Sequence, residues 1–311
     1  MGFDIDALRA AVLAHGRVVR VVIAGLRGSS PREVGAAMLV WPGGQSGTIG
    51  GGALEFEAAE AARRQDVATK LSQHALGPDL GQCCGGAVTL LSELYDLAAV
   101  NALDGDVVAR AVGTDAVPLS VGRLLAQARG QGVAPVTQLL DGWMIEPVHK
   151  PARQLWIWGA GHVGRALVDV LAPMPDIAIT WVDTAPERFP GDAPVGVTLV
   201  PAANPADLVR HAPTEAEHLV LTYSHALDLE LCHRLLAHEF AFAGLIGSAT
   251  KWARFRSRLA ALGHGAARIA QITCPIGQPS LGKHPQMIAV GVAADLLRPA
   301  LHHINKKDIS A

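Results

Sequence analysis

Residues 155–164 read LWIWGAGHVG, an apolar run followed by glycines at positions 159, 161 and 164. The apolar run predicts a buried strand, and the glycines predict a tight turn into a helix. In this fingerprint the first glycine permits the turn and the second lets backbone N–H groups reach a phosphate. The third lets the helix pack closely on the strand. The stretch therefore predicts a Rossmann-like strand–turn–helix unit.

Alternating strands and helices continue from this stretch toward the C-terminus. We expect further strands at residues 177–182, 218–223, 242–246 and 268–273, with helices at residues 165–171, 228–238, 248–262 and from about residue 285. Such alternation is typical of a doubly wound parallel sheet. The second half is therefore predicted to be a Rossmann-like domain.

The first half has a different pattern. Strands are predicted at residues 17–26, 36–41, 87–95, 107–112 and 143–148, and helices at residues 4–15 and 53–65. A polar run and Pro151 interrupt the pattern, which is typical of a domain boundary. We therefore expect an α/β protein with an N-terminal α+β domain, residues 1–150, followed by the Rossmann-like domain, residues 151–311.

Composition limits the classes of function. The chain has 311 residues, half of them hydrophobic, and a net charge of −2. No basic field points to nucleic acid, and no run approaches the roughly 20 apolar residues that span a bilayer. Four cysteines make no disulfide framework, and the acidic start lacks the features of a signal peptide. We expect a cytoplasmic protein that binds neither nucleic acid nor membrane.

The predicted sheet gathers polar and small residues at one edge, because ligands of an open parallel sheet bind beyond the carboxyl ends of its strands. The candidates are Gly159, Gly161, His162, Gly164, Asp183, His225, Ser248 and Cys274. Asp183 lies 19 residues after Gly164 and could accept a hydrogen bond from a ribose hydroxyl. NAD is thus one possible ligand. The alternatives are a glycine turn without a nucleotide, and histidines that are ordinary loop residues.

Two adjacent cysteines lie between paired glycines at residues 81–86, GQCCGG. Neighbouring side chains point in different directions, so both cannot serve one core. A disulfide between them would be strained. Soft thiolates in such a loop suit a soft metal or a sulfur atom, which makes Cys83 and Cys84 candidate metal ligands. The alternative is a glycine-rich turn in which both cysteines fill space as small hydrophobes.

The first half also contains a glycine loop, GTIGGG at residues 47–52, before a predicted helix. Backbone N–H groups of Gly50, Gly51 and Gly52 could hold an anion at that helix start. Glu55 could hold a ligand amine or the loop itself, or lie on a solvated helix face. Earlier in the chain, Ser30 and Arg32 offer a hydroxyl and a guanidinium suited to phosphate, or form a plain surface turn.

These motifs together resemble the XdhC/CoxI family, the accessory proteins of molybdenum hydroxylases. The resemblance covers nearly the whole chain, and the cysteine pair with the run CPIG at residues 274–277 is its most specific part. It implies binding of the molybdenum cofactor in its molybdopterin form through the candidate residues above. It also implies support for cofactor sulfuration with a cysteine desulfurase as donor, delivery to the molybdenum subunit of apo xanthine dehydrogenase, and a homodimer.

Two positions depart from the family pattern, and two other functions stay open. Ala53 follows the triple glycine where the family often has His or Cys, and Tyr223 stands where it often has His. An NAD-dependent oxidoreductase would leave the cysteine pair unexplained. A sulfurtransferase carrying a persulfide on Cys83 or Cys84 overlaps with the accessory role. We assign no catalytic residue and expect a chaperone without turnover of its own.

Overall fold

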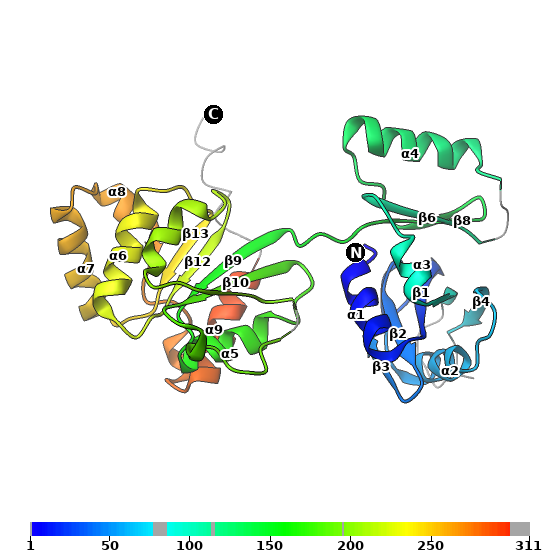
Figure 1. Ribbon diagram of the computed structural model, residues 1–311, viewed down its shortest axis with the longest axis horizontal. Helices are drawn as coiled ribbons and strands as arrows, with labels where there is room; N and C mark the ends of the chain where they lie inside the picture. Colours follow the sequence, from blue (N-terminus) through cyan, green and yellow to red (C-terminus); the bar gives the residue numbers. More distant parts are fainter. Residues whose placement is uncertain (1, 77–85, 113–115, 195, 299–311) are drawn as a thin grey trace. The chain divides into compact units, whose positions relative to one another are not determined.

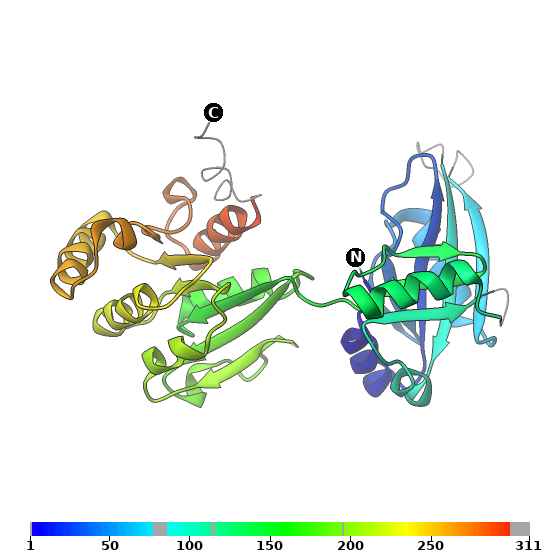
Figure 2. The ribbon, with the colours of Figure 1, turned by 90° about the horizontal axis from the view of Figure 1, so that it is seen from above.

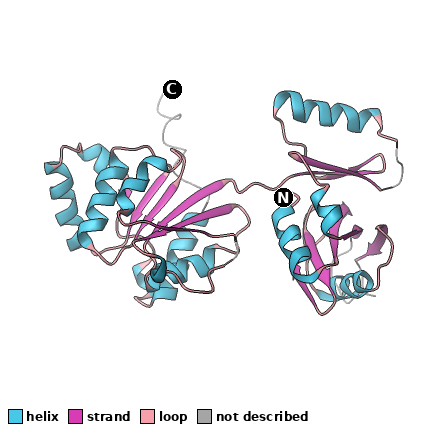
Figure 3. Cartoon of the chain, in the orientation of Figure 1, coloured by secondary structure: helices cyan, strands magenta, loops and turns pink. Residues whose placement is uncertain are grey.

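In a computed structural model the chain forms two compact units, unit 1 (residues 1–150) and unit 2 (residues 151–311) (Figure 1). The structure describes residues 2–76, 86–112, 116–194 and 196–298. Each unit has its own sheets and its own hydrophobic core (Figure 3). Among the described residues, no helix has the length and apolar character needed to cross a bilayer.

Unit 1 is built on a five-stranded antiparallel sheet in the order β3-β2-β1-β5-β4. The strands are β1 (Val18–Arg27), β2 (Ala37–Trp41), β3 (Gly44–Gly47), β4 (Thr69–Ala75) and β5 (Ala87–Tyr95). The central strand β1 is almost continuously apolar because both faces of the sheet are covered.

Each face of this sheet packs on different elements. Helix α2 (Gly52–Arg63) packs on the face that carries Val19, Val21 and Ile23. The opposite face packs on α1 (Ile5–His15), α3 (Leu97–Asn101) and a small second sheet. That sheet has the order β6-β8-β7, and α4 lies beside it (Figure 2). These elements are β6 (Val107–Ala111), β7 (Gln138–Leu140), β8 (Trp143–Pro147) and α4 (Leu119–Gln131).

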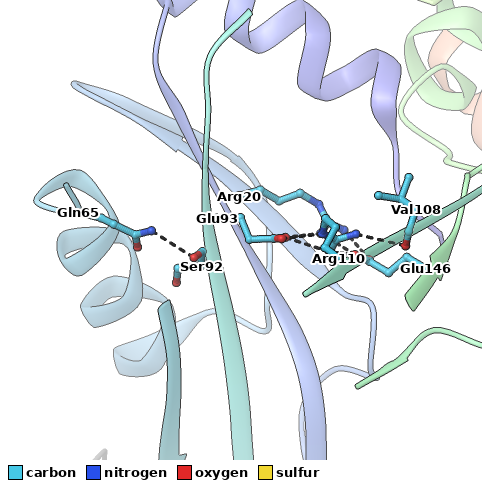
Figure 4. Close-up of polar contacts among 7 residues, drawn as sticks. All are labelled: Arg20, Gln65, Ser92, Glu93, Val108, Arg110 and Glu146. Atoms are coloured by element: carbon cyan, nitrogen blue, oxygen red, sulfur yellow. Dashed lines mark hydrogen bonds and ion pairs between the residues drawn. The ribbon is translucent and has the colours of Figure 1, made fainter. Parts of the chain in front are cut away.

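Four charged side chains join the two sheets of unit 1 in a buried network (Figure 4). Arg20 of β1 donates two hydrogen bonds to Glu146 of β8, at 3.0 and 2.7 Å. Arg110 of β6 donates to Glu93 of β5 at 2.6 and 2.9 Å and to Glu146 at 2.5 Å. Both guanidinium groups also lie over the ring of Phe3. The network therefore contains two cations and two anions, and each sheet contributes residues of both signs.

Unit 2 is a six-stranded sheet in which every pair of neighbouring strands is parallel (Figures 1 and 3). The order is β11-β10-β9-β12-β13-β14, so the strand order reverses beside the first strand, β9. The strands are β9 (Arg153–Trp158), β10 (Ile177–Asp183), β11 (Thr198–Pro201), β12 (Glu217–Val220), β13 (Phe242–Leu245) and β14 (Ile272–Thr273). The predicted fold class, an α+β region followed by a doubly wound Rossmann-like domain, is confirmed.

Helices cover both faces of this sheet. One core contains residues of α5 (His162–Leu171) and α9 (Pro285–Leu297) packed on Leu155 and Ile157 of β9. The other contains residues of α6 (His225–Leu236), α7 (Ala249–Ala261) and α8 (Ala266–Ile269) with Trp158. Short 3-10 helices lie at Pro186–Arg188 (η2), Pro205–His211 (η3) and Pro279–Leu281 (η4).

Two predicted strands differ from the structure. The strand predicted at residues 268–273 is wrong, because this segment begins in α8 and only Ile272–Thr273 pairs as β14. Ile269 and Ile272 are buried in one core, and a spacing of three residues does not fit the two-residue alternation of a strand. The strand predicted at residues 218–223 ends at Val220, and the N–H of Thr222 donates to the Asp228 side chain instead.

Candidate functional site

The three fingerprint glycines of unit 2 have different surroundings. A Cβ atom on Gly159 would lie 2.6 Å from the carbonyl oxygen of Leu221, and one on Gly164 would overlap the carbonyl oxygen of Gly159. No atom lies within 4 Å of a Cβ built on Gly161. Helix α5 begins directly after Gly161 without a side-chain cap. Gly159 and Gly164 therefore serve packing, whereas Gly161 leaves the helix start open to an anion.

Asp183 ends β10 and holds this loop in place. Its buried carboxylate accepts hydrogen bonds from the N–H groups of Ala160 and Thr184, both at 2.6 Å. The indole N–H of Trp181, on the same strand, donates to the Gly159 carbonyl at 3.0 Å. The carboxylate thus already has protein partners. Its predicted hydrogen bond to a ribose hydroxyl stays a prediction.

A buried ion pair that the sequence analysis missed lies at the same edge of the sheet. Asp228, which is fully buried in α6, accepts from the N–H and hydroxyl of Thr222 at 3.0 and 2.7 Å. Its other oxygen accepts from Lys251 Nζ of α7 at 2.6 Å, and this ammonium also donates to the Ile246 carbonyl at 2.9 Å. The pair fixes the loops that follow β12 and β13. The sequence feature that could have indicated this pair is an aspartate in the first turn of the helix that Ser224 caps.

The remaining predicted residues of unit 2 lie at the carboxyl edge of the sheet but differ in exposure. His162 and His225 are exposed at the first residues of α5 and α6. The Ser248 hydroxyl caps α7 by accepting from the N–H of Lys251 at 3.2 Å. Cys274 is half-buried, and burial raises the pKa of its thiol to about 11 although Lys251 lies nearby. Cys274 is therefore a protonated thiol at neutral pH.

In unit 1, Glu55 closes the glycine loop. Its carboxylate accepts from the Thr48 hydroxyl at 2.5 Å and from the N–H groups of Ile49 and Gly51 at 2.9 and 3.0 Å. Burial alone would raise the pKa of Glu55, but these hydrogen bonds outweigh burial and hold the pKa below its ordinary value. Of the alternatives, Glu55 holds the loop itself. The loop N–H groups that it occupies are not free for an external anion.

The predicted loops of unit 1 meet at one end of its five-stranded sheet. A Cβ atom on Gly50 would lie 2.6 Å from Pro31 Cγ, and one on Gly86 would overlap the Ser29 carbonyl oxygen. Gly86, two residues after the cysteine pair, is therefore packed on the turn at residues 28–32, which also contacts the glycine loop. Cys83 and Cys84 themselves lie outside the described residues.

Polar groups at this end of unit 1 can meet a phosphate. The Ser30 hydroxyl oxygen is buried and has no hydrogen-bond partner among the described residues. The Arg32 guanidinium lies 3.6 Å from Glu33. Helix α2 begins after Gly51 without a side-chain cap, and a Cβ on Gly51 would meet open space. In the part of the chain that the structure describes, no group of three or more His, Cys, Asp or Glu side chains could hold a metal ion.

Comparison with known proteins relates both units of the chain to one family. A model described as the XdhC Rossmann domain matches residues 155–296, and a model of the XdhC and CoxI family matches residues 11–71. The chain is thus similar to the XdhC and CoxI family in both of its units. The predicted resemblance is thereby confirmed.

Individual relatives extend this result. YqeB of Escherichia coli K12, an uncharacterised protein, is 30% identical over 155 residues, which are 49% of this chain and 28% of YqeB. The matched stretch thus spans less than a third of that relative. A Bacillus halodurans protein described as a xanthine dehydrogenase has a crystal structure that is similar with a TM-score of 0.66. The match covers 94% of this chain and 95% of that chain at 22% identity, so the likeness concerns the fold.

Proposed function

We propose that this protein is a maturation factor for xanthine dehydrogenase. In this role it binds the molybdenum cofactor in its molybdopterin form, supports cofactor sulfuration and delivers the cofactor to the molybdenum subunit of the apo-enzyme. One observation carries the proposal. The glycine loop and Gly86, which lies two residues after the cysteine pair, both pack on the turn at residues 28–32 in unit 1 of a chain whose two units both match this family.

The described residues suit the phosphate end of such a ligand. The unpartnered Ser30 hydroxyl can donate to a phosphate oxygen, and the uncapped first turn of α2 presents N–H groups beside it. When bound, the cofactor supplies a molybdenum atom held by a dithiolene. Cys83 and Cys84, which precede Gly86 in the sequence, are the soft donors that we assign to that end of the ligand.

The proposal includes partners and a mode of action. A cysteine desulfurase supplies the terminal sulfur, and the protein acts as a homodimer without turnover of its own. The protonated Cys274 of unit 2 is a poor nucleophile at neutral pH. We therefore place sulfur handling with the cysteine pair rather than with Cys274. A persulfide on Cys83 or Cys84, detected by mass spectrometry after incubation with a desulfurase and cysteine, would identify the sulfurtransferase variant of this role.

The test replaces both loop cysteines by alanine in the full chain, purified from a cofactor-producing cell. We expect the Cys83→Ala, Cys84→Ala double variant to lose most of its molybdenum and pterin and to activate apo xanthine dehydrogenase poorly. Cys232→Ala is the matched control, because Cys232 is a free cysteine buried in the unit 2 core. Thermal unfolding of both variants checks that the fold is intact. A folded double variant with full metal content and full activation would contradict the proposal.

A further inference from the structure

Arg188 and Tyr223 meet at the carboxyl edge of the unit 2 sheet. Arg188 ends η2 after β10, Tyr223 follows β12, and the guanidinium carbon lies 4.9 Å from the centre of the tyrosine ring. Strands β10 and β12 are the two neighbours of β9, whose loop contains Gly161. The pair therefore links the two sides of the fingerprint loop.

Core packing does not account for this pair. The Tyr223 side chain is 70% exposed, in contrast to the buried aromatic residues Trp158 and Trp181 of the same sheet. Arg188 Nε is 3.4 Å from Asp183 Oδ1 but makes no hydrogen bond among the described residues. Asp183 already accepts two backbone N–H groups, so its hold on the loop does not require Arg188.

The charges around the loop favour a phosphate. Arg165 Nε donates to the Ala160 carbonyl at 3.2 Å, and a second nitrogen of its guanidinium donates to the Arg188 carbonyl at 2.9 Å. Arg165 therefore contacts the fingerprint loop directly, and Arg188 lies beside Asp183, which holds that loop. Together with the uncapped start of α5, this arrangement suits an anion.

We propose that Tyr223 and Arg188 form a stacking subsite for the planar heterocycle of a phosphorylated ligand, whose phosphate lies on the fingerprint loop. A guanidinium is flat and cationic, and it stacks on aromatic faces as a heterocycle does. Tyr223 supplies a stacking face for the heterocycle, and Arg188 pairs with a phosphate oxygen. The chemical class is a nitrogen heterocycle that carries phosphate, which a nucleotide and a phosphorylated pterin share.

This inference goes beyond the maturation role, which depends on unit 1, and it can be tested without a client enzyme. Isothermal calorimetry on the full chain would measure the affinity for ADP and for neopterin monophosphate, with adenosine and neopterin as controls that lack phosphate. We expect one of the phosphorylated probes to bind more tightly than its control. Which probe binds identifies the source of the heterocycle.

Variants separate stacking from phosphate binding. Tyr223→Ala should weaken binding of that probe on the order of tenfold, because an aromatic face is lost, whereas Tyr223→Phe keeps the ring and should bind like the wild type. Arg188→Ala should reduce both the affinity and its dependence on salt. Gly161→Val should abolish binding while folding normally, because its side chain would enter open space in this structure.

Two results would overturn the subsite. One is that neither probe binds the wild-type chain more tightly than its control. The other is that folded Tyr223→Ala and Gly161→Val variants both bind a probe as the wild type does. Neither result bears on activation of xanthine dehydrogenase, so failure of this inference and failure of the maturation role are distinguishable.

Discussion

At the scale of single residues, Glu55 shows that a carboxylate of the chain itself can occupy the N–H groups of a glycine loop. The GTIGGG sequence suggests a phosphate-binding loop, but a carboxylate from the following helix takes the N–H groups of Ile49 and Gly51. Loop N–H groups bind any suitably placed oxygen, whether it belongs to a ligand or to the chain itself. An external phosphate in unit 1 is therefore expected at the first turn of α2, beyond the groups that Glu55 occupies.

Replacement of Glu55 by glutamine should destabilise unit 1 in a pH-dependent way. The folded-state pKa of Glu55 lies below its ordinary value of 4.5, so its stabilisation is fully present above that pH. It is lost as the pH falls through the folded-state pKa. We expect Glu55→Gln to lower the free energy of unfolding by about 1 kcal/mol at pH 7 and the difference to vanish at low pH. Urea unfolding of both proteins at pH 7 and below pH 4.5 measures this. A difference that persists unchanged at low pH would contradict it.

The sequence identified several residues of the site but not all of their partners. Asp183 was assigned a possible ligand contact, whereas it accepts backbone N–H groups of a nearby loop. For Glu55, contact with its own loop was one of the alternatives, and the structure shows that contact. Asp228 and Lys251 were missed because they lie on two different helices and are 23 residues apart in the sequence. No periodic pattern connects such positions. Hydrogen-bond partners depend on the three-dimensional course of loops, which residue types alone do not determine.

At the scale of elements, the buried network between the two sheets of unit 1 is the feature most sensitive to substitution. The carboxylate of Glu146 is fully buried between Arg20 and Arg110. Burial alone would raise the pKa of Glu146, but the two guanidinium charges outweigh burial and lower it. Glu146 therefore stays ionised as the shared anion of both arginines.

Removal of the shared Glu146 carboxylate should weaken the interaction between the two sheets of unit 1. Glu146→Ala leaves Arg20 buried without its closest partner, so we expect the free energy of unfolding to fall by about 3–5 kcal/mol. Glu57→Ala is the control, because Glu57 is exposed on α2 and its loss should change stability by less than about 0.5 kcal/mol. Urea denaturation followed by circular dichroism provides both values. Equal stability of the two variants would show that the network contributes little.

Elements with strong local patterns were predicted well, and polar ones were missed. The β-branched run of β1 and the alternation of β5 gave those strands within one or two residues. Strand β4 reads TKLSQHA and is mostly exposed, so it has no apolar alternation that marks it. Helix α4 contains two glycines and buries only Val121 among its residues, and its pattern is correspondingly weak. Both owe their place to neighbouring elements rather than to their own propensity.

At the scale of the whole molecule, each hydrophobic core of the described residues belongs to a single unit. Each of the five clusters of buried residues lies entirely in residues 1–150 or entirely in residues 151–311. A unit that has its own core is expected to fold without its neighbour.

Separate expression of residues 1–150 and residues 151–311 tests this independence. We expect each fragment to show its secondary structure by circular dichroism and to unfold cooperatively in urea. The 151–311 fragment should also keep the nucleotide or pterin affinity of the full chain, since the proposed subsite uses unit 2 residues alone. A fragment that is unfolded or aggregated on its own would mean that its stability depends on the other unit.

The hydrogen bond from Trp181 to the fingerprint loop has a practical consequence. The indole is fully buried, lies edge-on to Phe189 at 5.4 Å, and donates to the carbonyl of the first fingerprint glycine. Indole emission responds to the dipoles around the ring, so a ligand that shifts this carbonyl changes the fluorescence of Trp181. The chain thus contains an intrinsic optical probe next to its Rossmann loop, and the difference in emission between the wild type and a Trp181→Phe variant separates this signal from that of the other five tryptophans.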